Sequence, residues 1–154
     1  MKALFLDRDG TINVDYGYVH EWSKFEFIEG VVEFCRRAQD RGYSIFVVTN
    51  QSGIARGMFT EREYQALTRR MKREFARQGV KIAAVYHCPA LEGPNRKPAP
   101  GLFLKAQRRY GIDMRRSVSV GDKPRDVEAG KAAGVGRNVL LDVSRRNPFL
   151  GIRI

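Results

Sequence analysis

The sequence predicts an α/β protein: a single doubly wound, Rossmann-like domain over residues 1–154, with helices on both faces of a parallel sheet and no large cap domain. Short apolar runs alternate along the chain with longer amphipathic segments, which is the order of strand–helix units. The short runs are apolar at nearly every position, as expected for strands that are buried on both faces. With 154 residues, 43% of them hydrophobic and 29% charged, the chain can bury one core and is too apolar to be disordered.

The first elements are a strand, a helix and a second strand. Residues 3–6 form a continuous apolar run that predicts a strand. In residues 31–41 the apolar side chains recur at helical spacing, and Gly42 is suited to end that helix. Residues 44–48 are again mostly apolar and predict the second strand.

A longer helix follows. Thr60 and Glu63 have the spacing of a capping box, in which the side chain of each accepts a hydrogen bond from the backbone of the other. The helical pattern continues to residue 78, just before Gly79, and residues 82–86 predict the third strand.

The rest of the chain continues this alternation. Helices are predicted at residues 100–110 and 125–133, each followed by a glycine, and strands at residues 117–120 and 138–141. The final residues, 144–154, show no periodicity, and we expect them to form a loosely packed tail.

Composition and charge exclude several classes of protein. No run approaches the ~18 apolar residues of a membrane span, and the first residues lack the pattern of a signal peptide. Cys35 and Cys88 are too few for a disulfide framework or a CxxC metal site. The net charge of +11 indicates anionic partners, but the basic residues are spread over the polar faces of the predicted helices, which favours a solvated surface over a nucleic-acid interface. We expect a cytoplasmic protein with no membrane and no nucleic acid as partners.

Polar side chains lie where four of the predicted strands end, or in the loop that follows. Ligands in open parallel sheets bind beyond the carboxyl ends of the strands, so these segments are expected to meet. They are Asp7-Arg8-Asp9-Gly10-Thr11, Thr49-Asn50-Gln51-Ser52-Gly53, Arg96-Lys97-Pro98 and Gly121-Asp122-Lys123.

The side chains of these segments suit phosphoryl transfer. Asp7, Asp9 and Asp122 would repel one another unless a cation lay among them, and Mg²⁺ prefers such oxygen ligands. One carboxylate could then attack phosphorus, while another gives a proton to the leaving alkoxide and later takes one from water. The Thr49 hydroxyl and the Lys97 ammonium suit the phosphoryl oxygens. Each residue alone could be a turn or a solvated side chain, but their combination at strand ends favours a catalytic site.

This set of motifs resembles that of the haloacid dehalogenase superfamily, whose phosphatases carry DxDGT, a Thr or Ser at a strand end, a Lys and an acidic GD motif. The resemblance covers residues 3–141. It implies that Asp7 is the nucleophile and Asp9 the general acid and base. It further implies that Thr49 and Lys97 bind the phosphoryl group, and that Asp7, Asp122 and the backbone carbonyl of Asp9 hold Mg²⁺.

The segments DRDGTIN, TNQSGIARG, RKP and GDK are similar to the branch of that superfamily that contains heptose 1,7-bisphosphate phosphatases and histidinol phosphatases. The resemblance implies a small phosphorylated substrate, a sugar bisphosphate that loses its 7-phosphate during synthesis of lipopolysaccharide precursors. The residues implied in substrate binding are Arg8, Asp15, Tyr18, Asn50, Gln51, Ser52, Arg96 and Lys123.

One segment departs from that branch, whose members hold a structural zinc ion through three cysteines and a histidine in the loop before RKP. Here the loop spans only residues 89–95, and Cys88 alone resembles the first ligand. His87 and Cys88 are adjacent and cannot supply four tetrahedral ligands by themselves. We therefore expect Mg²⁺ as the cofactor and no structural zinc.

Other functions stay open at this point. Histidinol phosphate carries an amine, for which a basic chain is less suited, and a nucleic-acid 3′-phosphatase would use an open site and a basic surface. A catalytically silent binding module would not need paired carboxylates. The intervals between the motifs leave no room for a cap domain of about 50 residues, so we expect an open site and a monomer. The sequence does not decide whether Asp126 contacts the metal or orients Lys123.

Overall fold

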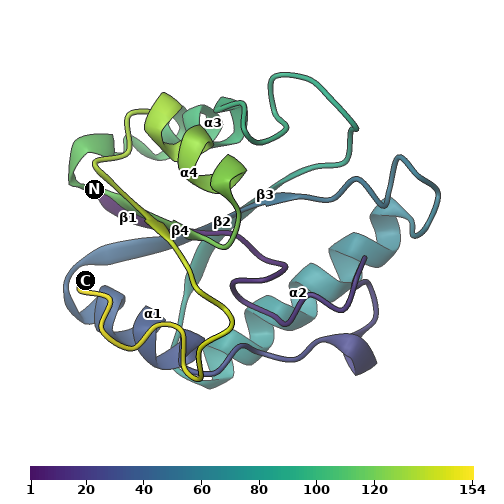
Figure 1. Cartoon of the computed structure of the whole chain (residues 1–154), viewed down its shortest axis with the longest axis horizontal. Helices are drawn as coiled ribbons and strands as arrows, with labels where there is room; N and C mark the ends of the chain where they lie inside the picture. The colour runs from purple at the N-terminus through teal and green to yellow at the C-terminus, as the bar shows by residue number, and fades with distance from the viewer.

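The protein is a five-stranded parallel sheet with helices on both faces, as the computed structural model of residues 1–154 shows (Figure 1). The strands are β1 (Lys2–Leu6), β2 (Tyr43–Asn50), β3 (Ile82–Cys88), β4 (Val118–Gly121) and β5 (Arg137–Leu140). The helices are α1 (Val31–Asp40), α2 (Glu61–Arg77), α3 (Gly101–Tyr110) and α4 (Pro124–Ala132), with short 3-10 helices η1 (Trp22–Lys24) and η2 (Met114–Arg116). The strand order is β3-β2-β1-β4-β5 with every neighbouring pair parallel, which confirms the predicted doubly wound fold.

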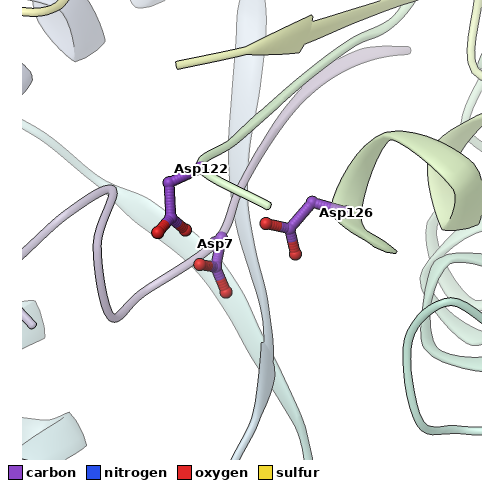
Figure 2. Close-up of side chains that lie close together, drawn as sticks. All are labelled: Asp7, Asp122 and Asp126. Carbon is purple, nitrogen blue, oxygen red and sulfur yellow. The ribbon is translucent and has the colours of Figure 1, made fainter. Parts of the chain in front are cut away.

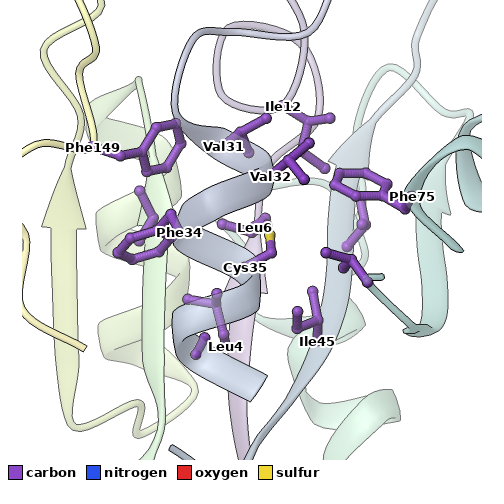
Figure 3. Close-up of a cluster of buried hydrophobic side chains, with 14 of the residues drawn as sticks. Leu4, Leu6, Ile12, Val31, Val32, Phe34, Cys35, Ile45, Phe75 and Phe149 are labelled. Atoms are coloured by element: carbon purple, nitrogen blue, oxygen red, sulfur yellow. The ribbon is translucent and has the colours of Figure 1, made fainter. Parts of the chain in front are cut away.

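Strand β1 shows why the middle of a buried strand is apolar. Successive side chains of a strand point to opposite faces, so Leu4 and Leu6 enter one core while Ala3 and Phe5 enter the other. The first core packs against α1 and α2, which lie below the sheet in Figure 1, and the second against α3 and α4 above it. Figure 3 shows the first core gathered around α1. Because both faces are covered, no strand position of β1 needs a polar residue.

Helix α2 begins as the sequence predicts. The Thr60 hydroxyl accepts a hydrogen bond from the backbone N–H of Glu63 at 3.1 Å, and the Glu63 carboxylate accepts one from the Thr60 N–H at 2.9 Å. This pairing satisfies two backbone donors that the first helical turn leaves without partners. It fixes the start of α2, which ten residues separate from the end of β2.

The segment between β1 and α1 is held by a row of aromatic rings. The Trp22 ring stacks on Phe25 at 5.1 Å, Phe25 meets Phe27 at 5.3 Å, and Phe27 meets Phe75 of α2 at 5.0 Å between centroids. The Arg70 guanidinium covers the Trp22 ring at 4.9 Å. These contacts fix the segment against α2, and they show that Trp22 is a packing residue.

The chain after β5 is anchored in the first core by Phe149, with Ile152 and Ile154 packed against the same core. Phe149 is 1% exposed, and its ring centroid lies 5.0 Å from that of Phe34 in α1. Both rings are labelled in Figure 3. The expectation of a loosely packed tail over residues 144–154 is therefore corrected, because a buried aromatic ring holds its middle. None of the helices combines the length and the hydrophobicity that crossing a membrane requires.

Candidate active site

Three carboxylates meet at the carboxyl edge of the sheet. Asp7 directly follows β1, Asp122 directly follows β4, and Asp126 lies in the first turn of α4. Because β1 and β4 are parallel neighbours, their ends bring Asp7 and Asp122 to the same edge. One oxygen from each of the three side chains lies within 4.8 Å of the others, and Figure 2 shows the carboxylates turned toward a common centre.

The electrostatics of this cluster favour a bound cation. Burial raises the pKa of Asp7 well above its usual range, and the neighbouring charges of Asp126 and Asp122 raise it further, against the opposing effect of Lys97. Burial also raises the pKa of Asp122, whose Oδ1 is buried without a hydrogen-bond partner. A Cβ atom on Gly10 would lie 2.2 Å from Asp122 Oδ2, so the glycine leaves room for this carboxylate. Closely spaced hard oxygen atoms with one unpartnered acceptor fit Mg²⁺.

Lys97 is the cation that the fold places in this cluster. Its side chain is 2% exposed, and Nζ donates to Asp7 Oδ1 at 2.9 Å, to Asp126 Oδ1 at 2.6 Å and to the carbonyl of Val48 at 2.7 Å. Burial opposes the charged form, but the two ion pairs outweigh it and raise the pKa of Lys97. All three ammonium donors are thus used within the protein.

The amide of Asn50 sets the position of Lys97. Its Nδ2 donates to the Lys97 carbonyl at 3.1 Å, and its Oδ1 accepts from the Lys97 N–H at 3.0 Å. This two-way bond ties the end of β2 to the loop that carries Arg96 and Lys97.

Asp9 lies apart from the three clustered carboxylates. Its oxygens accept hydrogen bonds from Arg8, from Asn13 Nδ2 at 3.0 Å and from Gln51 Nε2 at 2.9 Å. Gln51 Nε2 also donates to the Thr49 hydroxyl at 3.0 Å. One amide therefore joins Asp9, the predicted general acid and base, to Thr49, which is predicted to bind the phosphoryl group. The Asp9 side chain keeps 21% exposure.

A cavity of about 380 Å³ opens beside these groups. Asp7, Asp9 and Lys97 line its floor, and four further cations line it: Arg56, Arg96, Lys123 and Arg125. Asp15, Tyr18, Asn50, Gln51 and Ser52 complete the polar wall. The cavity therefore suits a small anionic ligand of more than one charge. Only η1, α1, α2 and the strands β2 and β3 lie between Asp7 and Lys97, so no inserted cap domain covers it.

Most residues that the sequence singled out meet at this cavity, with three exceptions. Thr49 is 1% exposed and is linked to the cavity through Gln51. Asp122 faces the carboxylate cluster and a neighbouring cavity of about 440 Å³. Arg8 does not line the cavity at all: it is 1% exposed and its guanidinium is bound to Asp9 and Val19. The assignment of Arg8 to substrate binding is therefore corrected, because its guanidinium is turned to Asp9 and Val19 and lies outside the cavity that the other cations line.

Three residues of the site were not assigned from the sequence. Asp126 was left open because its role depends on where α4 begins; here its Oδ2 also accepts the Lys123 N–H at 3.0 Å, which caps the helix. The GDKxxD spacing was the available signal, since it puts a carboxylate in the first turn after a strand end. Asn13 and Arg125 carried no such signal and are placed by the folded chain alone.

His87 and Cys88 lie at the end of β3, where they pack against α2 and the shortened loop. The His87 ring stacks on Tyr64 at 4.1 Å, and its Nε2 lies 2.8 Å from Glu61 Oε1. Hydrogen bonds from Gln65 and His87 lower the pKa of Glu61 against the opposing effect of its burial, which is the largest single influence. The Cys88 thiol is buried 3.9 Å from the Ala90 carbonyl.

The chain matches a family model and is similar to several named enzymes. The family model described as haloacid dehalogenase-like hydrolase matches residues 13–134. A D-glycero-beta-D-manno-heptose-1,7-bisphosphate 7-phosphatase of Yersinia pestis is 47% identical over 151 residues, covering 92% of this chain and 80% of its own. The D-glycero-alpha-D-manno-heptose-1,7-bisphosphate 7-phosphatase of Campylobacter jejuni is 46% identical over 146 residues, covering 94% and 85%. The two relatives thus differ in the anomer that they are named for.

Two solved structures are also similar. The D,D-heptose 1,7-bisphosphate phosphatase of B. bronchiseptica, complexed with magnesium and phosphate, superposes with a TM-score of 0.82 at 32% identity, over 89% of this chain and 79% of its own. The enzyme of the same name from Burkholderia thailandensis gives a TM-score of 0.64 at 33% identity, over 89% and 75%.

Proposed function

The chain belongs to the haloacid dehalogenase-like hydrolases, and on that premise we propose that it removes the 7-phosphate of D-glycero-D-manno-heptose 1,7-bisphosphate. It is a phosphomonoesterase of that family, and its relatives of 46–47% identity are named for this reaction. The observation that carries the proposal is one cavity with an acidic floor, where Asp7 meets Lys97, and a wall with four further cations. The floor suits a phosphoryl group under attack, and the wall suits a second phosphate on the same substrate.

In the proposed first step, Asp7 is the nucleophile. One of its carboxylate oxygens attacks the phosphorus of the 7-phosphate, and the bond from phosphorus to the sugar oxygen breaks. Asp9, carrying a proton, gives it to the departing sugar oxygen, so that the sugar leaves as an alcohol. The phosphoryl group is then held as an aspartyl phosphate on Asp7.

The second step returns the protein to its starting state. A water molecule attacks the phosphorus, Asp9 takes the proton that the water loses, and the bond from phosphorus to Asp7 breaks. Inorganic phosphate leaves. Lys97 keeps Asp7 paired before and after the reaction. In this proposal Thr49 and Lys97 stabilise the oxygens on which charge increases; the support is that Lys97 contacts Asp7 and that Gln51 joins Thr49 to Asp9.

Mg²⁺ is the proposed cofactor, held by Asp7, Asp122 and the backbone carbonyl of Asp9, with Asp126 beside it. When bound, it supplies positive charge to the phosphoryl oxygens. The fit rests on the unpartnered Oδ1 of Asp122 and on the pKa of Asp7, which burial and two neighbouring carboxylates raise when no cation is present.

The wall of the cavity supports a bisphosphate over an amine. Arg56, Arg96, Lys123 and Arg125 face it, whereas Asp15 is the one acid of the wall beyond the floor residues Asp7 and Asp9. An amine such as that of histidinol phosphate would meet mainly cations there, and like charges repel.

Phosphate release by the purified protein with Mg²⁺ tests the proposal. The substrates are both anomers of the heptose 1,7-bisphosphate, the heptose 7-phosphate, histidinol phosphate and a 3′-phosphorylated oligonucleotide. We expect kcat/KM to be highest for a bisphosphate, at least tenfold above the 7-phosphate. A higher kcat/KM for histidinol phosphate or for the oligonucleotide would overturn the proposed substrate assignment but would leave the proposed phosphatase chemistry in place.

A further inference from the structure

Arg8 is a buried cation that the catalytic steps above do not use. Its side chain is 1% exposed, although it stands between Asp7 and Asp9 in the sequence. Nη2 donates to the Val19 carbonyl at 2.7 Å and to Asp9 Oδ1 at 2.8 Å, and Nε lies 3.3 Å from the same oxygen. The Tyr64 ring lies beneath the guanidinium, 6.0 Å from its centre. Burying a charge in this way is costly unless a partner of opposite charge is held close.

The hydrogen bonds to Asp9 are unequal between its two oxygens. Oδ1 receives Arg8 through two nitrogens and Asn13 Nδ2 at 3.0 Å, so its acceptor positions are filled. Oδ2 receives Gln51 Nε2 at 2.9 Å and lies 3.1 Å from Arg8 Nη2, which is closer to Oδ1. Oδ2 thus receives two donors against three at Oδ1, and it is the oxygen with more capacity for a proton or for a hydrogen bond from a ligand in the cavity.

We propose that Arg8 is a positioning residue: its guanidinium holds Asp9 by Oδ1 and joins it to the Val19 carbonyl, so that Oδ2 is presented to the cavity for proton transfer. Arg8 acts only through Asp9 and touches no substrate. This inference rests on the proposed function, since it assigns a role within the same reaction.

The contact with Val19 adds a link to the cavity wall. Val19 directly follows Tyr18, which lines the cavity and has a backbone φ of +50°, a conformation that non-glycine residues rarely adopt. The planar guanidinium of Arg8 thus fixes both Asp9, the general acid and base, and the Tyr18–Val19 segment of the cavity wall. A lysine would lack the second donor, Nε, that also approaches Asp9 Oδ1, and it would lack the planar group that fixes the direction of both contacts.

A double-mutant cycle tests the proposal. Arg8→Met, Asp9→Asn and the double variant are compared with the wild type on the preferred sugar phosphate. Arg8→Met should lower kcat by about 100-fold, within the usual contribution of a general acid and base, and should change KM by less than about threefold. In the Asp9→Asn background the same substitution should lower kcat by less than about threefold, because its effect passes through Asp9.

The leaving group gives a second readout. p-Nitrophenolate leaves without a proton, so Arg8→Met should still release a rapid burst of about one p-nitrophenolate per active site from p-nitrophenyl phosphate, followed by slow turnover. The sugar phosphate should give no burst with this variant. Arg8→Lys should lose about tenfold in kcat on the sugar phosphate, and it serves in the same cycle if Arg8→Met does not fold.

The matched control is Arg70→Met, which also removes a guanidinium from an aromatic ring but lies over Trp22, away from Asp9. It should keep wild-type kcat. The positioning role is wrong if Arg8→Met lowers kcat in the Asp9→Asn background by as large a factor as in the wild type. It is also wrong if Arg8→Met raises KM and leaves kcat unchanged. If the wild type turns over none of the phosphate esters, the proposed function itself is wrong.

Discussion

Replacing Gly10 by alanine should remove the response of the protein to Mg²⁺ while leaving the fold in place. Gly10 has a φ of +89°, and a Cβ built there would lie 2.2 Å from Asp122 Oδ2 and 2.5 Å from its Cγ. Because the methyl group and the carboxylate cannot share that space, the Asp122 side chain must move away from Gly10 and out of its position in the carboxylate cluster. The variant therefore alters the proposed metal ligands without removing any of them.

The size of the effect follows from two contributions. The positive φ costs an alanine about 1–2 kcal/mol, and each kcal/mol lowers the Tm of a chain of this length by about 2–4 °C. Mg²⁺ at about a hundred times its Kd stabilises the folded state by about 2.7 kcal/mol, so the wild-type Tm should rise by about 5–11 °C. If Gly10→Ala raises the Kd about a hundredfold, the gain falls to about 0.4 kcal/mol.

Thermal unfolding with and without Mg²⁺ measures this difference, and Gly134→Ala is the control. Gly134 has a φ of +87°, but no heavy atom lies within 4 Å of its Cβ position. Both variants should lose a similar Tm from backbone strain, yet only Gly10→Ala should lose the Mg²⁺ shift. An equal Mg²⁺ shift in the two variants would refute the placement of the cation beside Asp122.

Three further predictions concern charge, pH and packing. Lys97→Met leaves the buried carboxylates of Asp7 and Asp126 without their ammonium partner, so urea denaturation without Mg²⁺ should show a loss of about 3–5 kcal/mol; a loss below about 1 kcal/mol would contradict the ion pairs. Burial raises the pKa of Tyr64 from 10.0 to about 12. As the pH rises, the unfolded chain therefore loses the Tyr64 proton before the folded chain does, and the stability present below pH 10 should decline between about pH 10 and 12. Tyr64→Phe should reduce the decline of Tm between about pH 10 and 12, and an unchanged decline would contradict the raised pKa of Tyr64. Phe149→Ala opens a void beside Phe34 and should cost about 3–5 kcal/mol in urea denaturation, whereas Leu150→Ala, at a side chain 65% exposed, should cost less than about 0.5 kcal/mol.

The fold could be predicted because its signals are local. The apolar runs of β1 and β2 report burial on both faces, and the Thr60–Glu63 pair marks the start of α2 within a few residues. Strand ends could be placed only to within a few residues. Strand β2 continues through Thr49 and Asn50, beyond the apolar run that predicted it, since polar residues at a strand end have no apolar pattern.

The candidate site could be predicted in part because the topology of a parallel sheet fixes where its strand ends lie. Parallel strands bring Asp7 and Asp122 to one edge, whatever the details of packing. The direction of the Arg8 side chain depends on the Val19 carbonyl and the Tyr64 ring, which come from distant parts of the chain. Phe149 was missed in the same way, because a single aromatic residue without periodicity does not reveal that its partner is Phe34.

The most direct measurement on the central claim is the mass of the protein quenched in acid during turnover of the heptose bisphosphate with Mg²⁺. The account predicts one phosphoryl group on the peptide that contains Asp7, and none on Asp7→Asn. A phosphoryl group on another residue, such as Asp9 or Thr49, or turnover that persists in Asp7→Asn, would contradict it.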